Sequence, residues 1–518
     1  MSVLDFWQEE TNGDGINLRW GHQVNSWPLL TEHLQDPELQ KSLLIEGDVY
    51  LRRYPRSEPV MSEPNTTNHS ITFKKWIFEV SKATIAKAIK TNFKSNQVIV
   101  PALNDLYAYS SDIRSPIIIH ADVMSSPGTR ESPVDPVKFT EKVTSKFPDA
   151  TVSVGWTETD IRRLDPSELR YSWRNLFDML ENTYQLHQPV MFSVSAPFAA
   201  NSFHQLLWLL GIRPNFSLLI KANASENITE WSGLVALRKF GNHRQILYDF
   251  PDKHRENLIT NSKLIGPKIY KRQTPWTPSA WRAVQFLNPR RHLSAVVTSR
   301  EGAAFLGWPT VFLLSEKQTR NSSREQTVSG RVLFVPKRNF RDVNQEERTG
   351  LSIYLLPSVN YIRSPDLNGR GGVRIFIGFR GRVVIENQPR RGGNSNQKRS
   401  RSSRHLTKAM SQLLTHDCYG FSVRDRDTEV EITVYLSRCT GSTAFPPPSY
   451  TRRLKLRVPG VPNGLQRHVI VQKTGDGTVD TLVEDLFHNN GMILTVKSKW
   501  KSLVITQVFL SILTFRPA

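Results

Sequence analysis

The chain has 518 residues, 38% of them hydrophobic, and a formal net charge of +21. This length exceeds one ordinary hydrophobic core and indicates two or three domains. No apolar run approaches the 18 residues of a transmembrane helix, and the N-terminal MSVLDFWQEE lacks the basic and apolar regions of a signal peptide. The two cysteines, Cys418 and Cys439, could pair, but they exclude a disulfide framework.

The charge is divided unevenly along the chain. Residues 1–260 hold 27 basic and 30 acidic side chains, a net charge of −3, which leaves +24 for residues 261–518. The basic character therefore belongs to the C-terminal half, and two unlike parts are expected.

Residues 18–250 alternate short apolar runs with segments of helical spacing. The runs cover residues 18–25, 42–50, 84–93, 115–123, 150–157, 188–196, 215–222 and 244–250, with helical spacing at 73–80, 135–146, 173–184 and 202–210. Near-continuous hydrophobic strands alternating with helices are typical of a parallel sheet covered on its outside. Eight such units predict an α/β fold, a (β/α)8 TIM-type barrel, with one extra hairpin-like strand at 59–61.

Polar side chains stand at or near the C-terminal ends of these expected strands, where such barrels carry their sites. Glu46 and Asp48 follow an apolar run and point to the same face, because they are two residues apart in a strand. Adjacent carboxylates need a cation, a shared proton or strong donors, and oxygen ligands suit Mg²⁺ or Ca²⁺. The other strand-end residues predicted to converge are His22, Asn25, Lys90, Asn92, Lys94, His120, Asp122, Trp156 and Asp249. Any one of them alone is more simply structural, for example a helix cap, but together they indicate a pocket.

The C-terminal half contains short β-type runs separated by turn residues, which predicts an all-β sandwich or a similar domain. Within it, residues 388–405 form a basic, Gly/Ser-rich segment that is predicted to be disordered. This segment is interpreted as a solvated loop, a nuclear-import signal or an attachment site for anionic glycans or lipids. Nucleic-acid binding is the less favoured alternative, because the segment is short and no RNA-binding signature accompanies it. The expected domains are a barrel at 4–258, a linker at 259–290 and a basic β-rich region at 291–518.

Motifs within residues 4–255 resemble those of the menorin family, in the same order. They are WGHQVNS, LIEGDVYL, PVMSEP, AIKTNFKS, IIIHADVM, SVGWTE, YSWRNL, QPVMFSVSA, NFSLLI and ILYDF. The family is distantly similar to glycerophosphodiester phosphodiesterase and phospholipase-C-like barrels. In those relatives two histidines are general acid and base, and an E-x-D pair with a third-strand carboxylate holds a metal. No such motif is found in the C-terminal half, so the resemblance is expected to end with the barrel.

The resemblance assigns roles to individual positions. His22 matches the first histidine, and Glu46 and Asp48 match the metal pair, whereas the second histidine position falls on Glu63 and the third-strand acid on Asn92. A site made of these two carboxylates with Glu63 and Asn92 implies weak binding of Mg²⁺ or Ca²⁺, because Asn92 offers a neutral oxygen in place of an anion.

At two further positions the chain departs from the family pattern, and both concern the binding of a substrate phosphate group. The arginine position of the family falls on Ser195 and the tryptophan position on Lys221, so a phosphate clamp is lost and Lys221 replaces it in part. His22 and Lys90 are therefore expected to be catalytic only if the barrel is active. The resemblance favours a non-catalytic, secreted recognition protein, a pseudoenzyme acting with neuronal or other cell-surface receptors or adhesion proteins. The alternative is a metal-dependent phosphodiester hydrolase with altered acid–base residues.

The expected location is the extracellular space, by resemblance, with the cytoplasm as the alternative. Six Asn-x-Ser/Thr sequons give weak support to a secretory route. Four of them lie in expected polar loops where glycans could be carried, at Asn65, Asn68, Asn223 and Asn227.

Overall fold

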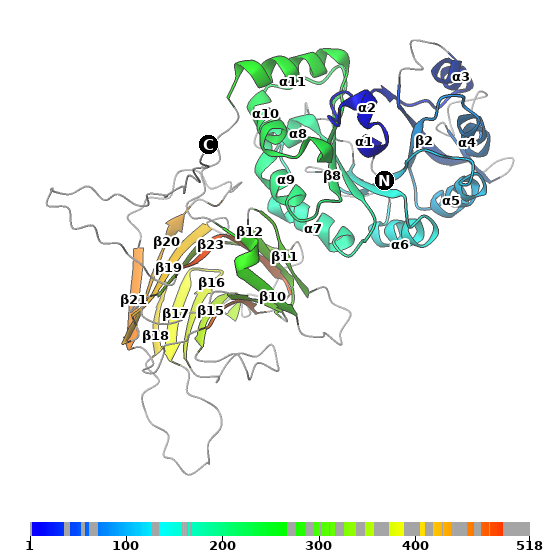
Figure 1. The fold of residues 1–518 in the computed structure, drawn as a ribbon. Helices are drawn as coiled ribbons and strands as arrows, with labels where there is room; N and C mark the ends of the chain where they lie inside the picture. Colours follow the sequence, from blue (N-terminus) through cyan, green and yellow to red (C-terminus); the bar gives the residue numbers. More distant parts are fainter. Residues whose placement is uncertain are drawn as a thin grey trace, which may run out of the picture.

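A computed structural model describes most of residues 3–489 in two parts, a helix-coated barrel and a β-sandwich (Figure 1). The description omits 1–2, 36–41, 53–56, 62–70, 127–133, 158, 160, 162–163, 166–167, 267–275, 286–293, 301, 310, 316–325, 338–347, 357–371, 388–404, 410–417, 427, 438, 440–452, 460–467, 476 and 490–518. The predicted disordered segment 388–405 therefore lies outside the described residues, except for its last residue.

The first part is a nearly closed barrel of eight parallel strands, which confirms the TIM-type prediction (Figure 1). In barrel order the strands are β1 (Trp20–Gly21), β2 (Leu44–Arg52), β4 (Ala88–Phe93), β5 (Ile117–Met124), β6 (Thr151–Trp156), β7 (Val190–Ser195), β8 (Phe216–Lys221) and β9 (Ile246–Asp249). A parallel bridge between Gly15 and Leu247 lies beside the seam between the last strand and the first. The predicted extra strand is β3 (Glu58–Val60), which pairs antiparallel with β2.

Most helices cover the outside of the barrel, but the first packs Val3 and Leu4 into the apolar cluster at the N-terminal end of the barrel. The helices are α1 (Val3–Phe6), α2 (Gln8–Thr11), α3 (Trp27–Gln35), α4 (Phe73–Ser81), α5 (Ile99–Ala108), α6 (Pro136–Lys146), α7 (Trp173–Thr183), α8 (Ala196–Asn201), α9 (Phe203–Leu210), α10 (Trp231–Phe240), α11 (Asp252–Leu264) and the 3₁₀ turn η3 (His243–Gln245). Side chains fix several starts: Asp135 accepts the Lys138 N–H before α6, and Ser172 and Asn175 form a capping box at α7. The four helices predicted from apolar spacing, at 73–80, 135–146, 173–184 and 202–210, correspond to α4, α6, α7 and α9 and are confirmed.

The barrel interior is apolar at its N-terminal end and polar at its C-terminal end. One buried cluster at the N-terminal end contains a residue from each of five strands: Leu44, Ala88, Ile118, Met191 and Leu219. The residues two and four positions later on the same strands are mostly polar, because alternate side chains of a strand share a face. This alternation carries the polar residues of the site into the barrel mouth.

The second part is a sandwich of two antiparallel sheets, as predicted from the spacing of the β-type runs. One sheet has the order β10 (Trp281–Gln285), β13 (Val311–Ser315), β22 (His468–Thr474), β15 (Gly350–Leu356), β16 (Val373–Gly378), β17 (Arg382–Asn387) and β18 (His405–Ala409). The other has the order β11 (Ser294–Thr298), β12 (Gly302–Gly307), β23 (Val479–Asn489), β14 (Gln326–Pro336), β19 (Cys418–Asp425), β20 (Glu429–Ser437) and β21 (Arg453–Pro459), and the turn η4 (Pro278–Ala280) precedes β10. Their facing apolar side chains form a separate core.

The predicted linker 259–290 is taken up at both ends by regular structure. Helix α11 continues to Leu264, and β10 begins at Trp281. The helix persists because its buried side chains, His254 and Leu258, hold its inner face against the barrel.

The barrel and the sandwich share an interface on the outer face of the second sheet. Arg174 of α7 forms an ion pair of 2.5 Å with Asp480 of β23, whose other oxygen accepts the Gly307 N–H. Lys337 forms a second pair with Glu181 across the same boundary. Since apolar residues of β12, β14 and β23 also belong to the barrel's core cluster, the two parts pack as one body.

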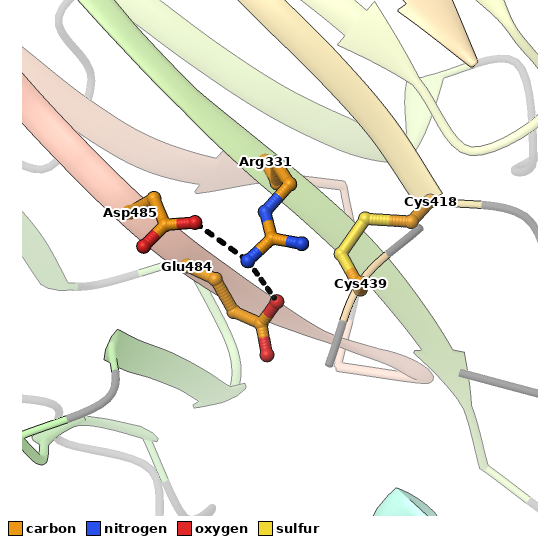
Figure 2. The surroundings of a disulfide bond; sticks show 5 residues. All are labelled: Arg331, Cys418, Cys439, Glu484 and Asp485. Atoms are coloured by element: carbon orange, nitrogen blue, oxygen red, sulfur yellow. Dashed lines mark hydrogen bonds and ion pairs between the residues drawn. A yellow bond between two sulfur atoms is a disulfide. The ribbon is translucent and has the colours of Figure 1, made fainter. Parts of the chain in front are cut away.

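The two cysteines form a disulfide, a pairing that the sequence had left open. The disulfide joins Cys418 in β19 to Cys439 just after β20, with Cα atoms 5.3 Å apart (Figure 2). Arg331 of β14 lies near it together with Glu484 and Asp485 of β23 (Figure 2).

Candidate functional site

A cavity of about 410 Å³ opens at the C-terminal ends of the barrel strands. Every barrel strand from β2 to β9 contributes a lining residue, and β1 contributes through His22, which follows it. The predicted site residues that line it are His22, Glu46, Asp48, Asn92, Lys94, His120, Asp122, Trp156, Lys221 and Asp249. Two further predicted residues, Asn25 and Lys90, contact this set from behind the lining, and Glu63 lies outside the described residues.

Glu46 is held by a buried ammonium group. The Lys90 side chain is 0% exposed, and its Nζ lies 2.6 Å from Glu46 Oε1 and 2.6 Å from Asn92 Oδ1. Asn92 Nδ2 donates to the same Glu46 oxygen at 2.5 Å. Burial raises the pKa of Glu46, but the charges of Lys90 and Lys221 and these hydrogen bonds lower it more, so the pKa lies well below its usual range. Glu46 is therefore ionised. Burial lowers the pKa of its partner Lys90 below the ordinary lysine range, whereas the charge and hydrogen bond of Glu46 counteract this and favour the ammonium form.

Asp48 has a second set of donors. Its Oδ1 accepts from Asn92 Nδ2 at 2.9 Å and pairs with Lys94 Nζ at 3.0 Å. Asn25 fixes the same residue from the other side, because its Oδ1 accepts the Asp48 N–H at 2.8 Å. Burial lowers the pKa of Lys94, but the Asp48 carboxylate raises it more, above the ordinary lysine range, so Lys94 stays charged.

His22 and Asp249 form a pair at the rim of the pocket. His22 Nε2 lies 2.8 Å from Asp249 Oδ1, and its Nδ1 lies 3.9 Å from Glu46 Oε2. Burial lowers the pKa of His22, but the hydrogen bond and charge of Asp249, together with Glu46, raise it above its ordinary value. His22 is half exposed, so it can exchange protons with solvent or with a ligand.

Replacing Asp249 with asparagine is expected to lower the pKa of His22, since the largest favourable contribution to its protonated form is removed. Protonated His22 and its pairing with Asp249 persist below the raised pKa and are lost as pH rises through it. The pH dependence of the histidine ring protons, followed by NMR, measures this. Asp112→Asn, at an exposed turn, is the control. An unchanged His22 pKa in Asp249→Asn would show that Glu46 alone sets it.

His120 is a buried, neutral residue. Its Nδ1 contacts Ser153 Oγ at 2.9 Å and its Nε2 lies 3.3 Å from Asp122 Oδ1. Burial and the charge of Lys90 lower the pKa of His120 to about 4, so it is uncharged at neutral pH. Gly155 makes this arrangement possible, since a Cβ there would collide with Asp122 and His120. His120 therefore orients Asp122, whose pKa lies below its usual range because, although burial raises it, His120, Lys221 and Lys94 lower it more.

One wall of the pocket is aromatic, and motif reasoning identified only part of it. Trp156 packs on Tyr171 with ring centroids 4.5 Å apart, and Tyr171 packs on Phe198 of α8 at 5.2 Å. Tyr171 also accepts the Ser195 N–H at 3.1 Å through its hydroxyl group. Tyr171 stands in the quoted YSWRNL motif, but nothing in its spacing places it at the barrel mouth. Ser193, also missed, could have been found because it is two residues before Ser195 on β7.

Three of the four metal ligands predicted from the resemblance belong to the described residues. Glu46, Asp48 and Asn92 lie side by side, but ammonium and amide groups occupy their facing oxygens. Among the described residues a different group has the spacing of a metal site: one ligand atom each of His22, Glu46 and Asp249, all within 4.8 Å of one another. Metal binding by the residues predicted from the resemblance, Glu46, Asp48, Glu63 and Asn92, stays a prediction.

Two of the four glycosylation candidates can be placed. Asn223 and Asn227 are exposed in the connection that follows β8, and Asn223 also lines the cavity. Asn65 and Asn68 lie outside the described residues.

A polar pocket at the C-terminal mouth of a (β/α)8 barrel, joined to a β-sandwich, defines a two-domain class of protein. Residues 14–255 match the family model of the menorin N-terminal domain, and residues 281–488 match that of the menorin C-terminal domain. The human protein FAM151B is 32% identical over 250 residues, which cover 47% of this chain and 87% of that protein. The chain belongs to the menorin family. The expectation that the resemblance ends with the barrel was wrong: the C-terminal match follows the sandwich, whose short alternating strands carry no motif as distinctive as those of the barrel.

Solved structures show only a distant likeness. The exoplasmic/lumenal domain of VIP36, in its Ca²⁺/Man3GlcNAc-bound form, is 8% identical with a TM-score of 0.29, and the match covers 42% of this chain and 87% of that one. An endo-1,3-beta-glucanase from Streptomyces sioyaensis is 10% identical with a TM-score of 0.27, over 42% and 90% of the two chains. These low scores support no inference about ligands. Among the described residues, no helix has the length and apolar character needed to cross a membrane.

Proposed function

We propose that this menorin-family protein is a non-catalytic recognition protein whose barrel pocket holds a small polar ligand. The observation that carries the proposal is the buried Lys90 ammonium between Glu46 and Asn92. A phosphodiesterase of this type needs its carboxylate pair to hold a cation that stabilises developing charge. Here an ammonium and an amide of the chain already bond Glu46 Oε1, so a metal held between Glu46 Oε1 and Asn92 has to displace them.

The acid–base groups support the same proposal. General acid–base hydrolysis needs one group to deprotonate the nucleophile and another to protonate the leaving oxygen. His22 with Asp249 can fill one role. His120, the other histidine that lines the pocket among the described residues, is buried, bonded on both ring nitrogens and neutral. The second role is therefore poorly filled in the part of the pocket that is described.

The proposal extends to the setting in which the protein works. We place it outside the cell, in partnership with a cell-surface receptor or adhesion protein, with the sandwich as a second binding domain and the basic segment 388–405 as an attachment point for anionic glycan or lipid. Exposed Asn223 and Asn227 support a secretory route, since both stand in glycosylation sequons.

A second function is favoured by one observation, the group formed by His22, Glu46 and Asp249. Their nitrogen and carboxylate atoms suit a divalent cation, and such an ion supplies Lewis-acid stabilisation to phosphodiester hydrolysis when it is bound. The alternative is thus a hydrolase with a displaced metal site that binds Mg²⁺ or Ca²⁺ weakly, because Lys90 repels a cation beside Glu46.

A hydrolysis assay separates the two functions. The purified full chain is expected to show little or no turnover of glycerophosphodiesters with either Mg²⁺ or Ca²⁺, because general acid–base catalysis is worth roughly 10²–10⁴ in rate and one partner is deficient. Partial activity is expected in Glu63→His plus Asn92→Asp, which restores the family pattern. His22→Ala is the matched control for any activity seen. Robust wild-type turnover that disappears in this control would establish the enzyme.

A further inference from the structure

We propose that the ligand of the barrel pocket is a neutral polyhydroxylated ring, a pyranose sugar or a cyclitol. The inference rests on the proposed recognition function and names the chemical class of its ligand. It is carried by three features of the pocket: its paired charges and excess of carboxylates, its aromatic wall and its unpartnered polar groups.

Three carboxylates of the pocket are paired with cationic side chains of the chain. Glu46 pairs with Lys90, Asp48 with Lys94 and Asp249 with His22. Lys221 also lines the pocket, and its charge lowers the pKa of both Glu46 and Asp122. A phosphate or sulfate group would have to enter beside five lining carboxylates, those of Glu46, Asp48, Asp122, Glu226 and Asp249, at a high electrostatic cost. A neutral ligand avoids this cost.

The opposite walls differ in chemistry. The rings of Trp156, Tyr171 and Phe198 make one side apolar, and the carboxylate, amide and ammonium groups of β2 and β4 make the other polar. A pyranose or cyclitol has the matching form, because its ring C–H groups present an apolar face while its hydroxyl groups project around the rim. Each hydroxyl both donates and accepts, so it can bridge a carboxylate to an ammonium or amide group.

Buried polar groups on the aromatic side have no partner within the described chain. Trp156 is 5% exposed and Ser193 is 3% exposed, both line the cavity, and neither the indole Nε1 nor the hydroxyl Oγ makes a hydrogen bond. The Ser195 hydroxyl oxygen, Oγ, is also buried and makes no hydrogen bond within the described residues. Unpaired buried donors are costly and are usually satisfied by a ligand or by water.

The size of the cavity fits one or two such rings. Its volume of about 410 Å³ is at the small end of the range of about 300–1,000 Å³ that is usual for small-molecule sites. Gln23 belongs to the lining and is exposed, so the pocket is in contact with solvent there and a longer chain of sugars could extend outward from the bound ring.

Binding to the full chain tests the proposal. A panel of free monosaccharides, their methyl glycosides, short oligosaccharides and myo-inositol is screened by saturation-transfer NMR, and hits are titrated by calorimetry. Inorganic phosphate and glycerophosphocholine are titrated alongside. At least one neutral polyol is expected to bind, and more tightly than either phosphate compound. A methyl glycoside that binds as well as the free sugar identifies a glycan end as the source, whereas preference for the free sugar identifies a free metabolite.

Two substitutions connect binding to the pocket. Trp156→Phe keeps an aromatic ring and removes the Nε1 donor, and Ser193→Ala removes the hydroxyl. Each is expected to weaken polyol binding about tenfold, the usual effect of losing one buried hydrogen bond to a ligand. Trp208→Phe is the matched control, because its Nε1 is also buried and unpartnered but lies in the helical core, away from the cavity. Thermal unfolding of each variant verifies folding, and Ser193→Ala serves alone if Trp156→Phe does not fold.

The possible failures are distinguishable. If no neutral polyol binds, or if both pocket variants bind as well as Trp208→Phe, the ligand class is wrong. If a phosphate ester binds instead and is not cleaved, the recognition function stands while this inference falls. If a bound compound is turned over, the recognition function falls as well.

Discussion

Replacing Lys90 with methionine is expected to lower the free energy of unfolding of the barrel by about 3–5 kcal/mol, the usual cost of removing one partner of a buried ion pair. Lys90 is fully buried, and its ammonium bonds both Glu46 and Asn92. Methionine fills a similar volume but leaves Glu46 as a buried carboxylate with the Asn92 amide as its hydrogen-bond donor and the charge of Lys221 as its remaining compensation. The mutant must protonate Glu46 or admit water or a cation to the site.

Denaturant unfolding followed by Trp fluorescence measures this effect. The double variant Lys90→Met plus Glu46→Gln is expected to recover most of the loss, because both charges are then absent. Lys94→Met is the matched control: Lys94 pairs with Asp48 but is 32% exposed, so water can replace it and the loss should be much smaller. Equal losses for Lys90→Met and Lys94→Met would mean that the Lys90–Glu46 pair does not support the barrel.

The affinity of the Lys90→Met variant for Mg²⁺ or Ca²⁺ tests whether Lys90 excludes a metal from the pocket. If the ammonium of Lys90 takes the place of a metal, then Lys90→Met should bind Mg²⁺ or Ca²⁺ more tightly than the wild type and be stabilised by it, since ligand binding to the folded state raises its stability. If Lys90→Met binds the cation no more tightly than the wild type, the ammonium of Lys90 does not take the place of a metal.

The side of the strand on which the site lies could be predicted from sequence, but its depth could not. Alternation along β2 and β4 placed Glu46, Asp48, Lys90 and Asn92 on the inner face, and the structure brings them together. The same alternation cannot say which inner residue reaches solvent. Lys90, expected as a catalytic group if the barrel is active, is buried below the lining because it lies one inner position deeper than Asn92.

Groups contributed by the connections were harder to predict. Tyr171 precedes α7 and Phe198 belongs to α8, so their meeting with Trp156 depends on how two loops fold over the barrel mouth. The order of the strands in the sandwich was likewise impossible to predict from local sequence patterns. Its β-type runs could be recognised one by one, but β14 pairs with β23 across about 150 residues of chain, and no local pattern encodes that order.

Replacing Arg331 with methionine is expected to destabilise the sandwich by about 3–5 kcal/mol, because two buried carboxylates would lose their shared cation. Arg331 of β14 lies 2.5 Å from Asp485 and 3.3 Å from Glu484 of β23, and both acids are almost fully buried (Figure 2). Consecutive strand residues normally point to opposite faces. Here the pairing register shifts between Ser329 and Arg331, and Asp485 has a φ of 50°, so the bulge turns both acids toward one guanidinium.

The contrast with a surface pair makes this prediction specific. Arg374→Met removes a partner of Glu386 at 3.0 Å, but both side chains are more than 20% exposed, so a loss below about 1 kcal/mol is expected. The triple variant Arg331→Met, Glu484→Gln, Asp485→Asn should regain most of the stability lost by the single one, since no uncompensated charge is left. Thermal and denaturant unfolding with the Cys418–Cys439 disulfide intact compares all three. If Arg331→Met unfolds no more easily than Arg374→Met, the two carboxylates share a proton or reach water, and the guanidinium does not hold β14 to β23.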